Sequence, residues 1–183
     1  MERTEILISG FGGQGVVRLG QIFSIAAVAE GLFTTMLVSH GTETRGGYVR
    51  SQVVIDSSPI DSPVVEDPDY FCAMSKSAYS KFGSLVRKGT ILYDPGYIVP
   101  DLSLLASQIS ISARDIAIEQ LGQDIFANIV YLGVLGQYFK AYISREKLLE
   151  ALTAKVPRAM GAKNVRAFEL GYSLALSSME DSF

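Results

Sequence analysis

The pattern of apolar and polar residues at the start of the chain predicts a strand, then a helix, then a second strand. The apolar run Glu5–Ser9 predicts a buried strand, and the glycine-rich stretch Gly10–Gly15 follows it as a turn. From Gln14 to Glu30 apolar side chains recur every three or four positions, which is the spacing of one helix face. Phe33–Ser39 is predicted as the next strand.

The middle of the chain combines short strands with one polar loop and one helix. Tyr48–Asp56 alternates like a strand, and Ser57–Pro68 is expected to be a loop because it carries three prolines. Further elements are expected as strands at Tyr70–Met74, Thr90–Tyr93 and Gln108–Ser112 and as a helix over Ser75–Val86.

Beyond Ala113 the hydrophobic spacing becomes helical. Four helices are predicted, at Ala113–Leu121, Ala127–Phe139, Arg145–Lys155 and Asn164–Leu176, and Ser144 and Asn164 are the expected N-caps of the last two. Strands that alternate with helices indicate an α/β fold. We therefore expect a Rossmann-like, three-layer arrangement with a mostly parallel sheet and a helical C-terminal portion, as a single domain over residues 1–183.

The composition fits a folded protein with much apolar surface to cover. Hydrophobic residues make up 48% and charged residues 19% of the 183 positions, so the chain has enough apolar material for a sizeable core. A sheet buried on both faces would account for this content, and so would a large interface with partner subunits.

Charge and cysteine content exclude several classes of function. The net charge is -3 and no run of Lys or Arg is present, so nucleic acid is not an expected partner. No apolar stretch reaches the ~18 residues of a membrane span, and the N-terminus lacks a signal peptide's pattern. With a single cysteine, Cys72, we expect a cytoplasmic protein.

The same counts argue against metal chemistry on this chain. One Cys cannot supply the thiolates of an iron–sulfur cluster, and one Cys with one His (His40) makes a zinc site improbable. Cys72 is expected to be a buried small hydrophobe, and three tyrosines are expected to be core or interface residues: Tyr131, Tyr138 and Tyr142.

The first glycine-rich turn has the G-x-G-x-x-G spacing of a dinucleotide-binding loop, from Gly10 through Gly12 to Gly15. That fingerprint also needs an acidic residue at the end of the second strand, where this chain has Ser39 and His40. Two other interpretations stay open: the glycines shape a tight strand-to-helix turn, or they bring backbone close to a phosphate-bearing ligand or another subunit.

A second polar loop, Gly41–Gly47, follows the second strand. Because it and the first loop follow parallel strands at their carboxyl ends, they are expected to lie close together, where open α/β sheets bind ligands. Arg45 suits a bidentate contact with phosphate or carboxylate, or it pairs with Glu43 or a partner chain. His40 either titrates near neutral pH or ends a strand.

Three stretches together resemble a known family: GFGGQGV (Gly10–Val16), GTETRGG (Gly41–Gly47) and NVRAFELGY (Asn164–Tyr172). They are similar to the gamma subunit of 2-oxoacid:ferredoxin oxidoreductases, a group that includes the pyruvate and ketoisovalerate enzymes. The AFELGY ending resembles the 2-oxoglutarate type most. Thr42 and Thr44 depart from the Pro-Glu-Met-Arg-Gly-Gly sequence that is frequent in that type.

The resemblance implies a role inside a multi-subunit enzyme. The complex decarboxylates a 2-oxoacid, here expected to be 2-oxoglutarate, on thiamine diphosphate and magnesium. It passes electrons through iron–sulfur clusters to ferredoxin and transfers the acyl group to coenzyme A. The other subunits hold those cofactors, and this chain is expected on the coenzyme A side, inactive alone. Its implied binding residues are Gly10, Gly12, Gly13, Gln14, Gly15, Glu43, Arg45, Gly46 and Gly47.

The residues are consistent with this division of labour. Thiamine diphosphate enzymes typically carry a Gly-Asp-Gly motif, and no Gly-Asp pair occurs in this sequence. Two alternatives remain at this point. The chain is a stand-alone nucleotide-binding oxidoreductase that uses NAD or flavin, or it is a purely structural subunit whose loops form only an interface.

Overall fold

The computed structural model describes residues 1–41 and 47–180, and for residues 176–180 it describes only the course of the helix. The elements in chain order are β1 (Thr4–Phe11), α1 (Val16–Ala29), β2 (Phe33–His40), β3 (Tyr48–Asp56), β4 (Tyr70–Ala73), α2 (Lys76–Phe82), β5 (Thr90–Tyr93), β6 (Ser107–Ser110), α3 (Ala113–Leu121), α4 (Ala127–Tyr138), α5 (Arg145–Lys155) and α6 (Gly161–Glu180). Short 3-10 turns, η1 (Gly83–Leu85), η2 (Asp124–Phe126) and η3 (Arg158–Met160), precede β5, α4 and α6. None of the helices described combines the length and apolarity needed to cross a bilayer.

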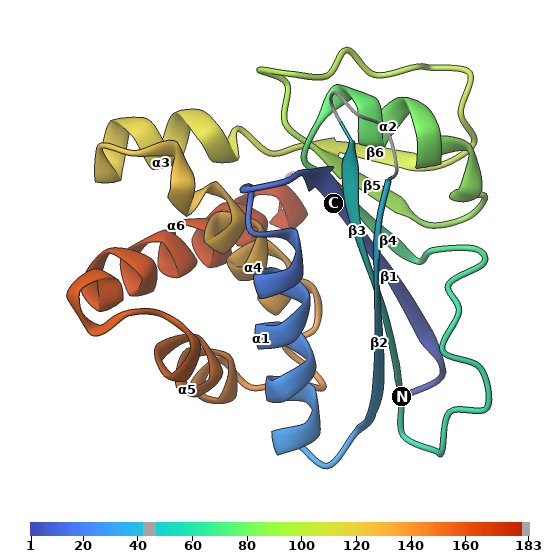
Figure 1. Cartoon of the computed structure of the whole chain (residues 1–183), viewed down its shortest axis with the longest axis horizontal. Coiled ribbons are helices and arrows are strands. Elements are labelled where there is room, and N and C mark those ends of the chain that lie inside the picture. The colour runs from blue at the N-terminus through green and yellow to red at the C-terminus, as the bar shows by residue number, and fades with distance from the viewer. Residues whose placement is uncertain (42–46, 181–183) are drawn as a thin grey trace.

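The strands form one sheet in the order β2-β3-β1-β4-β5-β6 (Figure 1). Strands β1, β4, β5 and β6 are parallel neighbours, and β3 is antiparallel to both β1 and β2. Two antiparallel pairings through β3 leave β1 and β2 pointing the same way. The predicted mostly parallel sheet is therefore confirmed, with β3 as its one reversed strand within the described residues.

Helices cover both faces of the sheet, which makes the three layers expected from the sequence (Figure 1). Ile6 and Ile8 of β1 point into a core shared with α1 and α4, whereas Leu7 points into a second core shared with α2. This alternation is the period of a strand buried on both sides. Burial on both faces therefore explains part of the high apolar content.

The C-terminal helices pack through glycines. Ten residues of α4, Asn128–Gln137, are buried, so α4 is the core helix of this half. A Cβ added at Gly133 would lie 2.1 Å from the Phe168 carbonyl oxygen, and one at Gly171 would lie 2.0 Å from that of Val130. The backbones of α4 and α6 thus approach more closely than any side chain at these glycines would allow.

Of the two predicted N-caps, one is confirmed and the other is wrong. Ser144 caps α5 as predicted, because its hydroxyl oxygen accepts a hydrogen bond from the Lys147 N–H at 3.3 Å. The N-cap prediction for Asn164 is wrong. The helix begins at Gly161, and the Asn164 amide lies inside it and donates to the Met160 carbonyl at 2.8 Å. The lead-in turn η3 carries the backbone into the helix earlier than the sequence pattern indicates.

The three tyrosines of the C-terminal half divide by exposure. Tyr131 is fully buried and Tyr138 is half-buried, with its ring 5.4 Å from that of Tyr70. Tyr142 is exposed, so it is not a core residue.

Candidate functional site

The first glycine-rich turn joins the end of β1 to the start of α1, at the edge of the sheet formed by the carboxyl ends of the parallel strands (Figure 1). Gly13 and Gly15 have positive φ angles of 93° and 77°, which favour glycine. Gly15 is the N-cap of α1, and no described side chain caps it. The first N–H groups of α1 are therefore available to an anion.

Gln14 ties this turn across the sheet. Its Oε1 accepts a hydrogen bond from the Phe11 N–H at 2.6 Å, and its Nε2 donates to the Met74 carbonyl at 2.9 Å. A Cβ on Gly10 would lie 2.4 Å from Gln14 Oε1 and 2.9 Å from the Met74 Cβ. Gly10 thus makes room for the Gln14 side chain, which links the end of β1 to the end of β4.

The remaining glycines of the turn have different environments. A Cβ on Gly15 would lie 2.2 Å from the Nδ2 of Asn128, a buried residue of α4 whose Oδ1 has no hydrogen-bond partner within the described part of the chain. For Gly12 and Gly13, no atom of residues 1–41 and 47–175, apart from their neighbours in sequence, lies within 4 Å of an added Cβ. Packing inside the chain explains Gly10 and Gly15, and the backbone angle explains Gly13, but neither explains Gly12.

The second loop begins and ends beside the first. Gly10 of β1 and His40 of β2 both lie opposite Val49 of β3. The Gly41 N–H donates to the Tyr48 carbonyl at 2.8 Å, which closes the base of the loop. Gly47 is half-buried directly before β3, whereas Glu43, Arg45 and Gly46 lie outside the described residues. The expected proximity of the two loops is therefore confirmed at their bases.

Two cavities flank the first turn. The larger, about 550 Å³, is called the basic pocket here because Arg18 and His40 line it and no acidic residue does, among the residues described. Its wall also contains Gly12, the start of α1 and Asn128. Backbone N–H groups, a guanidinium and an imidazole at one opening favour a negatively charged group.

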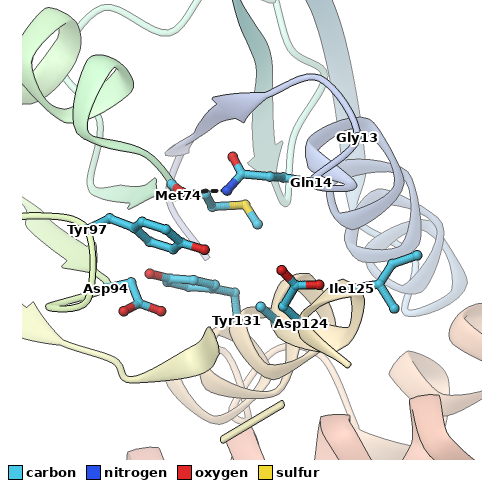
Figure 2. A pocket seen from close by; sticks show the side chains of 9 residues that line it. Gly13, Gln14, Met74, Asp94, Tyr97, Asp124, Ile125 and Tyr131 are labelled. Carbon is cyan, nitrogen blue, oxygen red and sulfur yellow. Dashed lines mark hydrogen bonds between the residues drawn. The ribbon is translucent and has the colours of Figure 1, made fainter. Parts of the chain in front are cut away.

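The smaller cavity, about 260 Å³, is called the acidic pocket because it is lined by Asp94 and Asp124 and by no Lys, Arg or His of the described chain. Figure 2 shows that the rings of Tyr97 and Tyr131 form part of its wall, below Gln14 and Met74. Gly13 and Ile125 line both pockets, so the two cavities meet at the turn with opposite local charge.

Comparison with known proteins places this fold. A sequence model of the family described as "Pyruvate ferredoxin/flavodoxin oxidoreductase" matches residues 5–174. The 2-oxoglutarate synthase subunit KorC of Methanocaldococcus jannaschii is 35% identical over 179 residues, with 94% of each chain covered.

The chain belongs to the pyruvate ferredoxin/flavodoxin oxidoreductase family.

Two solved structures of this family have the same fold. The gamma subunit of a keto/oxoacid ferredoxin oxidoreductase from Geobacter sulfurreducens superposes with a TM-score of 0.83 at 28% identity, over 95% of this chain and 99% of that one. A 2-oxoglutarate:ferredoxin oxidoreductase from Magnetococcus marinus, with 2-oxoglutarate, coenzyme A and succinyl-CoA bound, gives 0.86 at 27% identity. This superposition covers 97% of the present chain but only 32% of the Magnetococcus chain. The prediction from the three motifs, a gamma subunit of a 2-oxoacid:ferredoxin oxidoreductase, is confirmed.

The stand-alone nucleotide-binding alternative is not supported, and the sheet gives a physical reason. In a dinucleotide-binding domain the second strand lies beside the first and carries the ribose-binding acid. Here the antiparallel β3 lies between β1 and β2, and Gln14 links the ends of β1 and β4 where the strand order reverses. The G-x-G-x-x-G spacing of this family member therefore belongs to a strand-to-helix turn that differs from that of a dinucleotide-binding domain.

Sequence reasoning missed three polar residues of the basic pocket: Arg18, Gln21 and Asn128. Arg18 had a detectable signal, because it lies in the first turn of a helix that follows a glycine-rich loop. Asn128 had none, since α4 is far along the chain and meets the turn only through tertiary packing.

The cysteine of this family member does not suit metal or cluster binding. Cys72 is fully buried on β4, as predicted, and burial raises the pKa of its thiol far above the ordinary value. A cluster ligand must be a thiolate. In the described residues no group of three His, Cys, Asp or Glu side chains is placed to hold a metal ion.

Proposed function

We propose that this chain is the coenzyme A-side subunit of a complex that oxidises 2-oxoglutarate. The complex would convert 2-oxoglutarate, coenzyme A and oxidised ferredoxin into succinyl-CoA, carbon dioxide and reduced ferredoxin. One observation carries the choice of substrate: the similarity to a 2-oxoglutarate synthase subunit extends over 94% of both chains. Thiamine diphosphate, magnesium and the iron–sulfur clusters would belong to partner subunits. Residues 1–183 would act as one domain in the cytoplasm.

The basic pocket supports a role on the coenzyme A side. Coenzyme A carries phosphate groups, and the start of α1 offers N–H donors beside the guanidinium of Arg18. We propose that the N–H groups of Gly12–Gly15 and the guanidinium groups of Arg18 and Arg45 form one anion-binding edge. Glu43, Gly46 and Gly47 of the second loop would contact other parts of coenzyme A. Gly12 supports this proposal because no described residue occupies the space beside it.

Purification of the tagged chain from its native source tests the assignment. Partner subunits would be identified by mass, and ferredoxin reduction would be measured with 2-oxoglutarate, pyruvate, ketoisovalerate and indolepyruvate. We expect 2-oxoglutarate to give the highest kcat/KM and the isolated chain to give no turnover. A higher kcat/KM with another 2-oxoacid would overturn the substrate proposal, and turnover by the isolated chain would overturn the subunit proposal.

Substitutions within the assembled complex test the coenzyme A site. Arg18→Ala and Arg45→Ala are each expected to raise the dissociation constant for coenzyme A about tenfold, since each removes a charge-assisted contact. Arg166→Ala, an exposed position on α6, is the matched control and should leave the constant unchanged. Titration calorimetry measures all three. If both site variants bind coenzyme A like the wild type, the loops do not contact it.

Gly12→Ala separates ligand approach from interface. The added methyl group has no atom of the described residues within 4 Å, so the subunit should fold normally. We expect a complex that assembles with weakened coenzyme A binding. Normal folding with lost assembly would instead support the purely structural subunit.

A further inference from the structure

The acidic pocket contains a buried hydroxyl that lacks a hydrogen-bond partner. The side chain of Tyr131, on α4, is 1% exposed, and no partner for its hydroxyl exists among the described residues. Burial, followed by the nearby charge of Asp94, raises the pKa of Tyr131 well above its ordinary value, so the phenol stays protonated. An unpaired buried hydroxyl is costly, and this one lines a cavity large enough for a small group.

The two carboxylates of the pocket differ in their partners. Asp94 is held in place, because its Oδ1 accepts from the Gly96 N–H and its Oδ2 from the Arg114 N–H, each at 2.9 Å. Asp124, on η2, is exposed, and its carboxylate has no hydrogen bond or ion pair within the described part of the chain. Figure 2 shows the Asp124 side chain at the end of the cavity away from Asp94.

No positive charge of the described chain neutralises the cavity from its wall. The guanidinium of Arg114 lies over the Tyr97 ring, 5.6 Å from its centroid, and its nitrogen is 3.5 Å from Asp115. Arg114 therefore already faces another carboxylate. The pocket combines two acceptor carboxylates with two aromatic rings, which is the combination that binds organic cations.

We propose that the acidic pocket binds a protonated amine or guanidinium group, with Asp124 as its counter-charge, the hydroxyl of Tyr131 as a hydrogen-bond partner and the Tyr97 ring as a flat contact. The group comes either from a free small molecule or from a lysine or arginine side chain of a partner subunit. This site is separate from the proposed coenzyme A contacts, because anions are disfavoured beside Asp94 and Asp124.

Titration of the isolated full chain tests the chemistry directly. The probes are n-butylammonium and methylguanidinium, with D-ribose as a neutral hydrogen-bonding control and inorganic phosphate as an anionic one. Binding is followed by the amide NMR signals of Tyr97 and Asp124, which line the acidic pocket and not the basic pocket. We expect saturable shifts with at least one cation and none with ribose or phosphate. Asp124→Asn should weaken cation binding about fivefold and Tyr131→Phe about threefold, whereas Glu119→Gln on α3 should leave it unchanged.

Assembly distinguishes the two sources of the cation. If a partner side chain fills the pocket, Asp124→Asn lowers co-purification of partner subunits several-fold. The wild-type complex then does not bind n-butylammonium, because its pocket is already occupied. If a small molecule fills it, the variant assembles normally and the wild-type complex still binds the amine. Either result supports the proposal. It is overturned if neither cation shifts the signals, if ribose or phosphate shifts them equally, or if Asp124→Asn and Tyr131→Phe bind both cations like the wild type.

Discussion

Two buried tyrosines on opposite faces of the sheet show how a hydroxyl's partners decide its effect on stability. The Tyr79 hydroxyl donates to Gln108 Oε1 at 2.6 Å and accepts from the Asp101 N–H at 2.7 Å. The Tyr131 hydroxyl has neither kind of partner within the residues described. The hydroxyl group therefore stabilises the fold at Tyr79 and destabilises it at Tyr131.

Removal of each hydroxyl should change stability in opposite directions. We expect Tyr131→Phe to raise the free energy of unfolding by about 1 kcal/mol, because an unsatisfied polar group leaves the interior. Tyr79→Phe should lower it by about 1–2 kcal/mol, because two partners lose their hydrogen bonds. Urea denaturation of the full chain measures both. A loss of stability in Tyr131→Phe would mean that the hydroxyl is satisfied in solution.

The glycines of the first turn form a graded series. Gly10→Ala and Gly15→Ala are each expected to lower the free energy of unfolding by about 2–3 kcal/mol, since the new Cβ would meet Gln14 in one case and Asn128 in the other. Gly12→Ala should change it by less than about 0.5 kcal/mol. Equal effects at all three positions, seen by urea denaturation, would contradict this division.

At the site, sequence reasoning found the loops but not the reasons for their residues. The G-x-G-x-x-G spacing indicated the glycines. The position of the turn, however, is fixed by Gln14, because its side chain hydrogen-bonds both Phe11 and Met74. Gln14 was among the predicted site residues, but its structural role depends on the end of β4, which the spacing does not report. Partners that lie far apart in the chain cannot be read from a local motif.

Among the elements, α5 and α1 are joined by one polar contact. Glu30 follows α1 and accepts hydrogen bonds from the hydroxyl and the N–H of Ser144, the N–H at 3.0 Å. These bonds, led by that from the side chain, lower the pKa of the Glu30 carboxyl below its ordinary value. Ser144 therefore both caps α5 and fixes its start against the end of α1.

This contact predicts a pH-dependent effect of Ser144→Ala. Loss of the cap should cost about 1 kcal/mol near neutral pH. A carboxyl whose pKa is lowered by folding contributes stability that is complete above its unfolded pKa and is lost as the pH falls through the folded value. The difference in urea midpoint between wild type and variant should thus be larger at about pH 7 than at about pH 2. A constant difference would show that the Glu30 contact contributes nothing.

The strands and helices themselves were largely predictable, since hydrophobic period reports burial on one or both faces. The predicted ranges of Tyr48–Asp56 and Arg145–Lys155 match β3 and α5. The reversal of β3 was not predictable, because alternation is the same in both strand directions. The start of α6 was missed because Asn164 is a favoured cap residue that here lies within the helix.

At the scale of the whole molecule, the loop between β5 and β6 is the most exposed apolar segment described. Val99, Leu102 and Leu105 are 88%, 90% and 86% exposed. Apolar residues grouped in this way are typical of a surface that a partner covers. The Magnetococcus chain that contains this fold is about three times as long, so its remaining two thirds offer such a partner.

Leu102→Asp should therefore affect assembly but not folding. We expect an unchanged thermal midpoint for the isolated chain and a several-fold lower recovery of partner subunits on the tagged chain, because a charge would be buried at the interface. Ala154→Asp, an exposed position on α5, is the matched control. Equal recovery with both variants would place the interface elsewhere.

Strand β2 has a consequence for how the protein is made. It forms one edge of the sheet, and its eight residues include no Asp, Glu, Lys, Arg or Pro, while Phe33, Leu37 and Val38 are exposed. Such an edge pairs readily with any other open strand. At high concentration the isolated chain is therefore expected to be prone to join a second copy sheet to sheet. Any chain that paired with or covered β2 would suppress this self-association.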